Sequence, residues 1–275
     1  VIGGTEMIRE LNVKDREVLM DFVSEESSIN LFIIGDVERF GMVSPIQTLW
    51  GLYDERKGRL KGVLLRFRKY YTLYAKDPDV DLSELVEIVK KDPSASSISG
   101  KASVLKSLNQ IFIEEVCKKE FFCELNHDEL LFEYDPAVKK AVVEDGKRIY
   151  DLLEAIEEFS LTDTESAENI SENLRTGLGR TYYLENENGE MISMAQTTAE
   201  NSQSAMVVGV ATHPDYRKRG LMSRCLSNLC RELLKEEKKL CLFYDNPKAG
   251  AVYHRLGFQS IDHWIMRLNK RSKND

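Results

Sequence analysis

The stretch that decides the fold is Met206-Val-Val-Gly-Val-Ala-Thr212-His-Pro-Asp-Tyr-Arg217-Lys-Arg-Gly220-Leu-Met-Ser223. Its first part is rich in Val and predicts a strand that stops at Pro214. The apolar positions after Gly220 recur every four residues, which predicts a helix. Because the N–H groups at the start of a helix have no partners within it and carry the positive end of its dipole, this strand, loop and helix can hold phosphate oxygens.

Taken alone, the basic triplet Arg217-Lys218-Arg219 is equally compatible with a solvated surface turn. Two other phosphate-binding loops are excluded, because the chain contains neither G-x-x-x-x-G-K-S/T nor a G-x-G-x-x-G that follows a strand. The interpretation of the triplet therefore depends on the next strand and helix along the chain.

A second informative segment runs from Leu240 to Phe258. Leu240–Asn246 predicts a strand that ends in polar residues, Pro247 suits the first position of a helix, and that helix stops at Leu256-Gly257-Phe258. In this order the two segments resemble the GNAT superfamily of acyl-CoA-dependent N-acyltransferases over roughly residues 138–270. The family's pyrophosphate motif, Q/R-x-x-G-x-G/A, is matched from Arg217 to Leu221, and Met222 stands where glycine or alanine is usual.

The resemblance implies where an acyl-CoA would bind. The strand at Val210, Ala211 and Thr212 would pair with the pantetheine arm, and Gly209 stands where the family's strand has a bulge. Asn246 would bond the pantetheine or line its path. The loop residues that would hold the pyrophosphate are Arg217, Lys218, Arg219, Gly220, Leu221 and Met222.

The resemblance also implies that Tyr253 is the general acid that protonates the departing thiolate. A phenol with an ordinary pKa of about 10 stays protonated at neutral pH, whereas the alternative role is a core aromatic residue of an amphipathic helix. The general base stays open between Glu200 and Asp245, both expected near strand ends. His213 is expected to be structural, and His254 to point away from the site.

The remaining chemistry-bearing residues predict no further centre. Cys225, Cys230 and Cys241 fall on the core side of a helix or within a strand, where thiols are usually inert. We therefore expect the amine to attack the thioester directly in a ternary complex. The five cysteines and four histidines are too scattered for a metal site, so no metal is expected.

Length and charge exclude other classes of protein. A chain of 275 residues is long enough for two domains, and a net charge of −8 argues against partners such as nucleic acid or anionic membranes. No apolar run approaches a membrane span, and the odd number of cysteines without a C-x-x-C pair suggests a cytoplasmic protein. We expect a monomer or homodimer. Residues 1–6 are interpreted as a short remnant ahead of a natural start at Met7.

Both halves of the chain predict the same order of elements: a strand, two helices and a strand meander. The boundary is placed at Asp135-Pro136, because proline cannot donate to a strand ladder and biases the preceding residue away from helix. The predicted fold class is α/β of the α+β kind, with two GNAT-like domains, residues 7–134 and 135–275. Each is expected to be a mixed, mostly antiparallel sheet flanked by helices. Further strands and helices are predicted at Leu60–Tyr74, Lys101–Phe112, Phe121–Tyr134, Ala141–Glu144, Asp145–Phe159 and Thr164–Thr176.

The first half lacks the motifs of the second. Residues 75–81 form an acidic loop where a second phosphate loop would stand, and acidic groups repel pyrophosphate. We therefore expect a degenerate GNAT-like domain without cofactor that completes the core and walls the acceptor site. The alternative is a separate α+β domain that only aids folding.

The leading functional hypothesis is an N-acetyltransferase that moves an acetyl group from acetyl-CoA to a primary amine of a small molecule. One alternative is a tandem GNAT-like transferase that uses another acyl or aminoacyl donor. Another is a non-catalytic sensor that binds coenzyme A. The sequence does not identify the acceptor.

Overall fold

The computed structural model describes residues 6–54, 56–157 and 166–271. Its contacts divide the chain into two compact units, Val1–Phe122 with Ser260–Asp275, and Cys123–Gln259. These units differ from the predicted ranges 7–134 and 135–275 at both ends. The last strand pairs within the first unit, and Leu131 lies in the core of the second.

In the first unit the strands lie in the order β1-β2-β3-β4-β5-β12-β6, and β6 runs on into the second unit from Cys123. The pair β4–β5 is parallel, whereas β1–β2, β2–β3, β3–β4 and β5–β12 are antiparallel. The bounds of these strands are Glu6–Glu10 (β1), Gln47–Asp54 (β2), Arg59–Phe67 (β3), Tyr70–Ala75 (β4), Ser97–Lys101 (β5), Gln259–Asn269 (β12) and Glu115–Leu125 (β6). The helices are Val13–Asp15 (η1, a 3-10 turn), Arg16–Ser24 (α1), Leu31–Phe40 (α2), Ser83–Lys91 (α3) and Ala102–Leu105 (α4).

Helices cover both faces of this first sheet, as the alternation of side chains along β4 shows. Leu73 belongs to the core under α3, where Leu85 and Val89 are fully buried. The next residue, Tyr74, faces the other way, and its ring meets Phe22 of α1 with centroids 5.3 Å apart.

In the second unit the strand order is β11-β10-β9-β8-β7. The pair β10–β11 is parallel, and β7–β8, β8–β9 and β9–β10 are antiparallel. The bounds of these strands are Lys139–Lys140 (β7), Thr181–Glu185 (β8), Met191–Thr198 (β9), Ser204–Thr212 (β10) and Lys239–Tyr244 (β11). The helices are Val143–Asp145 (η2) and Pro214–Tyr216 (η3), both 3-10 turns, and Gly146–Glu154 (α5), Ala167–Thr176 (α6), Leu221–Lys235 (α7) and Pro247–Arg255 (α8).

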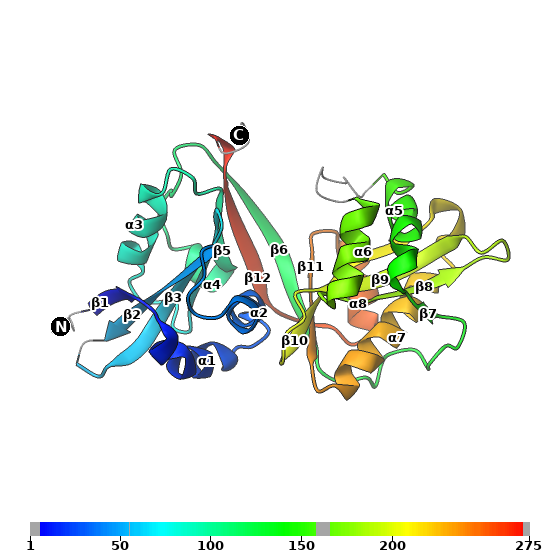
Figure 1. Cartoon of the computed structure of the whole chain (residues 1–275), viewed down its shortest axis with the longest axis horizontal. Helices are drawn as coiled ribbons and strands as arrows, with labels where there is room; N and C mark the ends of the chain where they lie inside the picture. Colours follow the sequence, from blue (N-terminus) through cyan, green and yellow to red (C-terminus); the bar gives the residue numbers. More distant parts are fainter. Residues whose placement is uncertain (1–5, 55, 158–165, 272–275) are drawn as a thin grey trace. The chain divides into compact units, whose positions relative to one another are not determined.

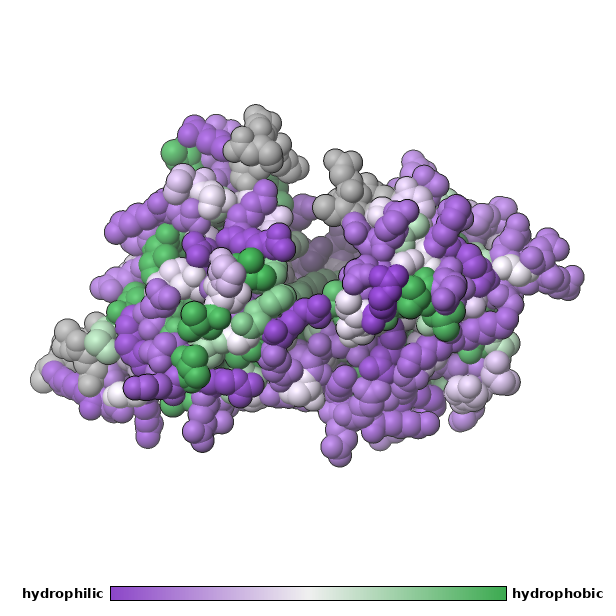
Figure 2. Space-filling model, in the orientation of Figure 1, coloured by the Kyte–Doolittle hydropathy of each residue, from purple (hydrophilic) through white to green (hydrophobic). Residues whose placement is uncertain are grey.

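The second sheet is also covered on both faces. Leu229 and Leu233 of α7 pack with Leu240 in one core cluster, and Ile149 of α5 packs with Tyr183 in another. Helices α5 and α6 lie side by side, as Figure 1 shows. The visible face of this unit is mostly hydrophilic in Figure 2. Helix α6 is part of this surface, since none of its side chains is fully buried. The predicted fold class, mixed and mostly antiparallel sheets flanked by helices, is confirmed.

Two predicted elements of the first unit have different extents. Leu60–Tyr74 forms two strands, because Arg68 adopts a left-handed turn with φ of 55° between β3 and β4. The predicted helix Lys101–Phe112 stops at Leu105, where Arg267 of β12 donates to the Leu105 carbonyl at 2.7 Å. The same guanidinium bonds the Leu108 and Asn109 carbonyls, so a long-range side chain satisfies groups that a helix would have used.

Two predicted elements near the start of the second half also differ. Phe121–Tyr134 contains only the end of β6, and the chain beyond it lies along α7, where Ser227 Oγ accepts from the Phe132 amide at 3.1 Å. The strand expected at Ala141–Glu144 is Lys139–Lys140 instead, because Asp145 closes a 3-10 turn by accepting from the Val142 amide at 3.0 Å.

The two helices expected next are shorter than predicted. Helix α5 ends at Glu154, before the predicted end at Phe159, and α6 begins at Ala167, after the predicted start at Thr164. Phe159 and Thr164 themselves lie outside the described residues. Within the described residues, no helix has both the length and the apolar character needed to cross a membrane.

Candidate active site

A bulge in β10 shapes the middle of the site. The pairing of β10 with β9 moves from Val208↔Gln196 to Ala211↔Met194, so two residues of β10 stand opposite one of β9. Gly209 has a φ of 53°, and a Cβ there would collide with the Gln196 side chain. Both backbone conformation and space therefore require glycine, and the expected bulge is present.

Strands β10 and β11 pair at their N-terminal ends and separate further along. Their parallel pairing ends at Met206↔Cys241. A cavity of about 820 Å³ opens beyond it, lined on one side by residues 207–212 and on the other by residues 242–246. The backbone of β10 facing the cavity is thus available for an extended ligand to pair with.

The basic loop and the first turn of α7 form one end of the cavity. Arg217, Lys218 and Arg219 are exposed and line it together with residues 220–223. Gly220 is the N-cap with a φ of 73°, and the first amide bonded within the helix is that of Arg224, to the Gly220 carbonyl at 3.2 Å. The preceding amides of the first turn are left for a ligand, and with three cations beside them they suit an anion.

Several contacts hold this loop in place. Ser193 Oγ lies 2.8 Å from Thr212 Oγ1, and the Arg217 Nε donates to the Thr212 carbonyl at 3.3 Å. The Arg219 guanidinium lies over the Tyr216 ring, 5.2 Å from its centroid. Lys218 adopts a left-handed φ of 63°, which turns the chain into Gly220. The loop is therefore tied to β9 and β10.

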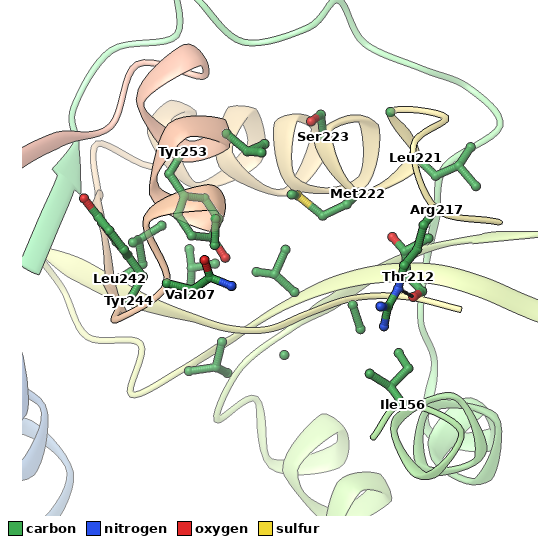
Figure 3. Close-up of a pocket in the computed structure, with 18 of the residues that line it drawn as sticks. Ile156, Val207, Thr212, Arg217, Leu221, Met222, Ser223, Leu242, Tyr244 and Tyr253 are labelled. Carbon is green, nitrogen blue, oxygen red and sulfur yellow. Dashed lines mark hydrogen bonds between the residues drawn. The ribbon is translucent and has the colours of Figure 1, made fainter. Parts of the chain in front are cut away.

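Met222 occupies the motif position where glycine or alanine is usual. Its side chain packs against the core cluster that includes Leu226 and also lines the cavity. Figure 3 shows it extending from α7 into the cavity on the side toward Tyr253. The thioether thus narrows the middle of the cavity rather than its basic end.

Helix α8 brings two predicted residues to the other side of the cavity. Asn246 is its N-cap, where Oδ1 accepts from the Lys248 amide at 2.9 Å, and this bond fixes the side chain so that its NH₂ group can donate to a ligand. The helix ends as Gly257 takes a φ of 97° and Phe258 returns to the core, 1% exposed. The spacing from Asn246 to Phe258 therefore has a structural cause at both ends.

Tyr253 points from α8 into the cavity, with Arg217 and Thr212 at the opposite end (Figure 3). Its ring lies 6.0 Å from that of Tyr244 and 6.0 Å from that of Phe258. Burial raises the pKa of the Tyr253 phenol above its ordinary value. The hydroxyl is consequently held in its protonated form at neutral pH.

The two candidate bases lie in different places. Asp245 is exposed and lines the cavity one residue before Asn246. Glu200 does not line it: its carboxylate receives two hydrogen bonds from Arg180, at 2.7 and 3.0 Å, and one from Thr197 Oγ1 at 2.5 Å. Only Asp245 of the pair is brought together with Tyr253.

The cysteines near the site are buried. Cys225 Sγ lies 3.6 Å from the Ser193 carbonyl, and burial raises its thiol pKa to about 12. Burial raises the thiol pKa of Cys230 as well. A thiol with so high a pKa is a poor nucleophile at neutral pH. Across the described ranges, no group of three or more His, Cys, Asp or Glu side chains is placed to hold a metal ion.

Some residues of the site had no signal in the sequence. Ile156 reaches the cavity from just after α5, and Gln196 fills the space under Gly209. Tyr244 lines the cavity, and its hydroxyl is 3.0 Å from His254 Nε2. His254 does not line the cavity, but both of its ring nitrogens lie within hydrogen-bond distance of a partner. Only contacts between separate elements identify these residues.

The corresponding strands of the first unit do not separate. Strands β4 and β5 pair up to Thr72↔Ser99, and the next residue, Gly100, packs so tightly on the Leu73 carbonyl that a Cβ would collide with it. Beyond them, Lys101 Nζ donates to the Lys76 carbonyl at 3.2 Å and so joins the two strand ends. The gap between β4 and β5 that would correspond to the cavity between β10 and β11 is therefore closed.

Comparisons with known proteins agree with this geometry. Residues 146–258 match the Acetyltransferase (GNAT) family. Over 77 residues, or 28% of this chain, the sequence is 26% identical to "Uncharacterized N-acetyltransferase ycf52" of Gracilaria tenuistipitata var. liui. The match spans 42% of that protein's length.

Solved structures show that the likeness in fold extends over the whole chain. A Drosophila protein superposes with a TM-score of 0.65 at 12% identity, over 96% of this chain and 99% of its own. A tandem GNAT protein from the clavulanic acid biosynthesis pathway superposes with a TM-score of 0.57 at 15% identity, over 98% of this chain and all of its own, 100%. At such identities the likeness concerns fold alone.

The cavity between β10 and β11, the loop before α7 and the family match fall within the same part of the chain. The part of the chain that matches the GNAT acetyltransferase family therefore holds the candidate site, and the fold of the chain is similar to that of a tandem GNAT protein.

Proposed function

We propose that this protein is an N-acetyltransferase that transfers the acetyl group of acetyl-CoA to the primary amine of a small molecule. The observation that carries the proposal is the cavity that joins a basic helix start, an unpaired strand edge and the half-buried phenol of Tyr253. Each of the three matches one part of an acyl-CoA: pyrophosphate, pantetheine and thioester.

The binding residues follow from this match. The amides of the first turn of α7, with Arg217 and Arg219, would receive the pyrophosphate oxygens. The backbone of β10 from Val210 to Thr212 would pair with the amides of the pantetheine arm, and the side-chain NH₂ of Asn246 would donate to it. The thioester would then lie beside Val207 and Val208, in the apolar part of the cavity.

The chemistry is direct transfer. The nitrogen lone pair of the amine attacks the thioester carbon, a C–N bond forms, and the C–S bond then breaks. Tyr253 donates its phenolic proton to the departing sulfur. Asp245 accepts the proton that the amine nitrogen loses, directly or through a water molecule. A route through Cys225 is disfavoured, because a thiol with a pKa of about 12 is almost wholly protonated at neutral pH.

The first unit has no part in binding the donor in this proposal. Its strands β4 and β5 stay together, and Lys101 joins their ends by donating to the Lys76 carbonyl. The loop that follows β4 carries acidic residues at 77, 79 and 81, where a phosphate would need cations. One acyl-CoA per chain is therefore expected.

The test is a panel of small amines and peptides assayed for release of free thiol from acetyl-CoA, together with calorimetric titration of coenzyme A. Thiol release with at least one small amine, and one binding site per chain, support the proposal. The double variant Arg217→Gln/Arg219→Gln should weaken binding, whereas the matched Arg175→Gln on α6 should not.

Other outcomes would replace the proposal. Tight coenzyme A binding without thiol release from any acceptor would indicate a sensor. Release only with longer acyl donors would indicate another acyltransferase, and absence of coenzyme A binding would contradict the proposal as a whole.

A further inference from the structure

A chain of hydrogen bonds links β11, α8 and the core beside the cavity. The Tyr244 hydroxyl lies 3.0 Å from His254 Nε2, and His254 Nδ1 lies 2.8 Å from the Phe258 carbonyl oxygen. A carbonyl oxygen can only accept, so Nδ1 carries the proton. In the neutral ring Nε2 is then the acceptor, and the Tyr244 hydroxyl donates to it.

Gly250 permits this arrangement. It lies on α8 one turn before His254, and a Cβ at this position would collide with the Tyr244 ring. The small residue therefore lets the tyrosine of β11 lie close to the helix and reach the imidazole. A glycine inside a helix costs about 1 kcal/mol relative to alanine, a cost that close packing of this kind explains.

Tyr253 packs against two of the residues that this chain of bonds connects. The centroids of the Tyr244 and Phe258 rings each lie 6.0 Å from the centroid of the Tyr253 ring. His254 is its immediate neighbour in sequence. Rotation of α8 about its axis would move the Tyr253 hydroxyl along the cavity, and the bonds of His254 to β11 and to the chain after α8 oppose that rotation.

We propose that Tyr244 and His254 form a clamp that positions Tyr253 for proton transfer to the departing thiolate. This inference rests on the proposed function. The two residues act through Tyr253 and are positioning residues. The imidazole is exposed and the phenol of Tyr244 lines the cavity, so the clamp extends from solvent to the site.

The test is a double-mutant cycle on kcat and on the KM for acetyl-CoA. Tyr244→Phe and His254→Ala each remove the same hydrogen bond, so each should lower kcat about five- to tenfold, the factor expected for one such bond. The double variant should be no slower than the slower single variant. The KM for acetyl-CoA should not change, because the pyrophosphate loop is untouched. His254→Gln, whose side-chain oxygen can accept from Tyr244, should recover much of the lost rate.

Matched controls are His127→Ala and Tyr134→Phe, which change an exposed histidine and an exposed tyrosine elsewhere. Multiplied losses in the double variant, wild-type kcat in His254→Ala, or a rise in KM equal to the fall in kcat would overturn the clamp. NMR of isotope-labelled histidine gives a readout independent of activity. His254 should show the Nδ1–H tautomer, and its Nε2 resonance should shift in Tyr244→Phe. Absence of thiol release by the wild type would count against the proposed function. Wild-type release with fully active variants would count against the clamp alone.

Discussion

The Arg180 guanidinium contacts the Glu200 carboxylate at 2.7 Å, and this ion pair lies outside the cavity that Tyr253 lines. The Glu200 side chain is only 7% exposed, and Arg180 also bonds Glu232 and Glu236 of α7. Arg180 therefore joins the start of β8 to the end of β9 and to the end of α7.

The first prediction concerns this ion pair. Arg180→Met should lower the free energy of unfolding by about 3–5 kcal/mol, because it leaves a buried carboxylate with the more distant Lys238, 3.5 Å away, as its cation. Glu200→Gln should also lower stability and should leave kcat unchanged. Urea denaturation and the thiol-release assay measure the two effects, with exposed Glu129→Gln as the control. A large fall in kcat at undiminished stability would make Glu200 a candidate base again.

A second ion pair of Arg180, with Glu236 of α7, makes the stability depend on acid. The hydrogen bond from Arg180 lowers the pKa of Glu236 to about 2, below the value of about 4.3 expected in the unfolded chain. The stabilisation is thus fully present above pH of about 4.3 and is lost as the pH falls through about 2. In Arg180→Met the decline of stability over this range should be shallower.

Asp245→Asn is predicted to separate chemistry from binding. An amide side chain cannot accept the proton that the amine nitrogen loses as it attacks the thioester, so kcat should fall about 100-fold or more, as for other general bases. Because Asp245 is exposed, the free energy of unfolding and the affinity for coenzyme A should not change. Unchanged turnover would mean that water alone takes the proton, and raising the pH should partly restore the rate of the variant if the base assignment holds.

Tyr253→Phe is predicted to lower kcat about 100-fold or more while acetyl-CoA still binds, because the ring remains and only the acidic proton is lost. Burial raises the pKa of the phenol, so its protonated, active form persists to a higher pH than for an exposed tyrosine. The alkaline limb of the wild-type kcat profile should therefore lie above pH of about 10 and be absent in the variant. An alkaline limb that survives in Tyr253→Phe would assign the acid to another group.

Gly209→Ala is predicted to damage the site through the backbone. The new methyl group meets the Gln196 side chain, and a φ of 53° is strained for alanine. We expect a loss of about 1–3 kcal/mol in stability and a larger KM for acetyl-CoA, since the strand edge that receives the pantetheine would shift. The double variant Gly209→Ala/Gln196→Ala removes the collision but not the strain. Complete recovery in it would show that the backbone conformation matters little.

Asp36 of α2 supplies a stability test in the first unit. Burial raises the pKa of this carboxyl to about 6. Because the unfolded value is lower, about 3.9, its contribution to stability is fully present below that pH and is lost as the pH rises through about 6. Asp36→Asn should therefore raise the free energy of unfolding by about 2–3 kcal/mol at pH 8, where the wild type buries a charge. Equal gains at pH 4 and pH 8 would contradict this.

Much of the donor side of the site could be predicted from local sequence. Gly220 and the basic triplet before it, and Asn246 with the Leu256-Gly257-Phe258 ending, act through helix ends that lie within a few residues of them. The bulge at Gly209 was predictable for the same reason, because a glycine within a strand often marks a bulge at its own position. The match to a known family placed these pieces in order.

The contacts that could not be predicted depend on partners distant in the chain. Arg180 meets Glu236 across 56 residues, and Arg267 ends α4 from 162 residues away. Neither contact leaves a periodic pattern near either partner. The pairing of Tyr244 with His254 spans a turn and a helix start, so the spacing of the two residues gives no indication of it.

Strand β12 has a consequence for how the chain is made. Its residues Trp264 to Leu268 pair with β5, and Trp264 is buried to 2% exposure within the first unit. The ribosome therefore delivers every residue of Cys123–Gln259 before it delivers the strand that covers the edge of β5. During synthesis the edge of β5 in the first unit therefore stays unpaired until β12 is made, whereas every residue of the second unit has by then been added to the chain. The half that is translated first is thus completed last.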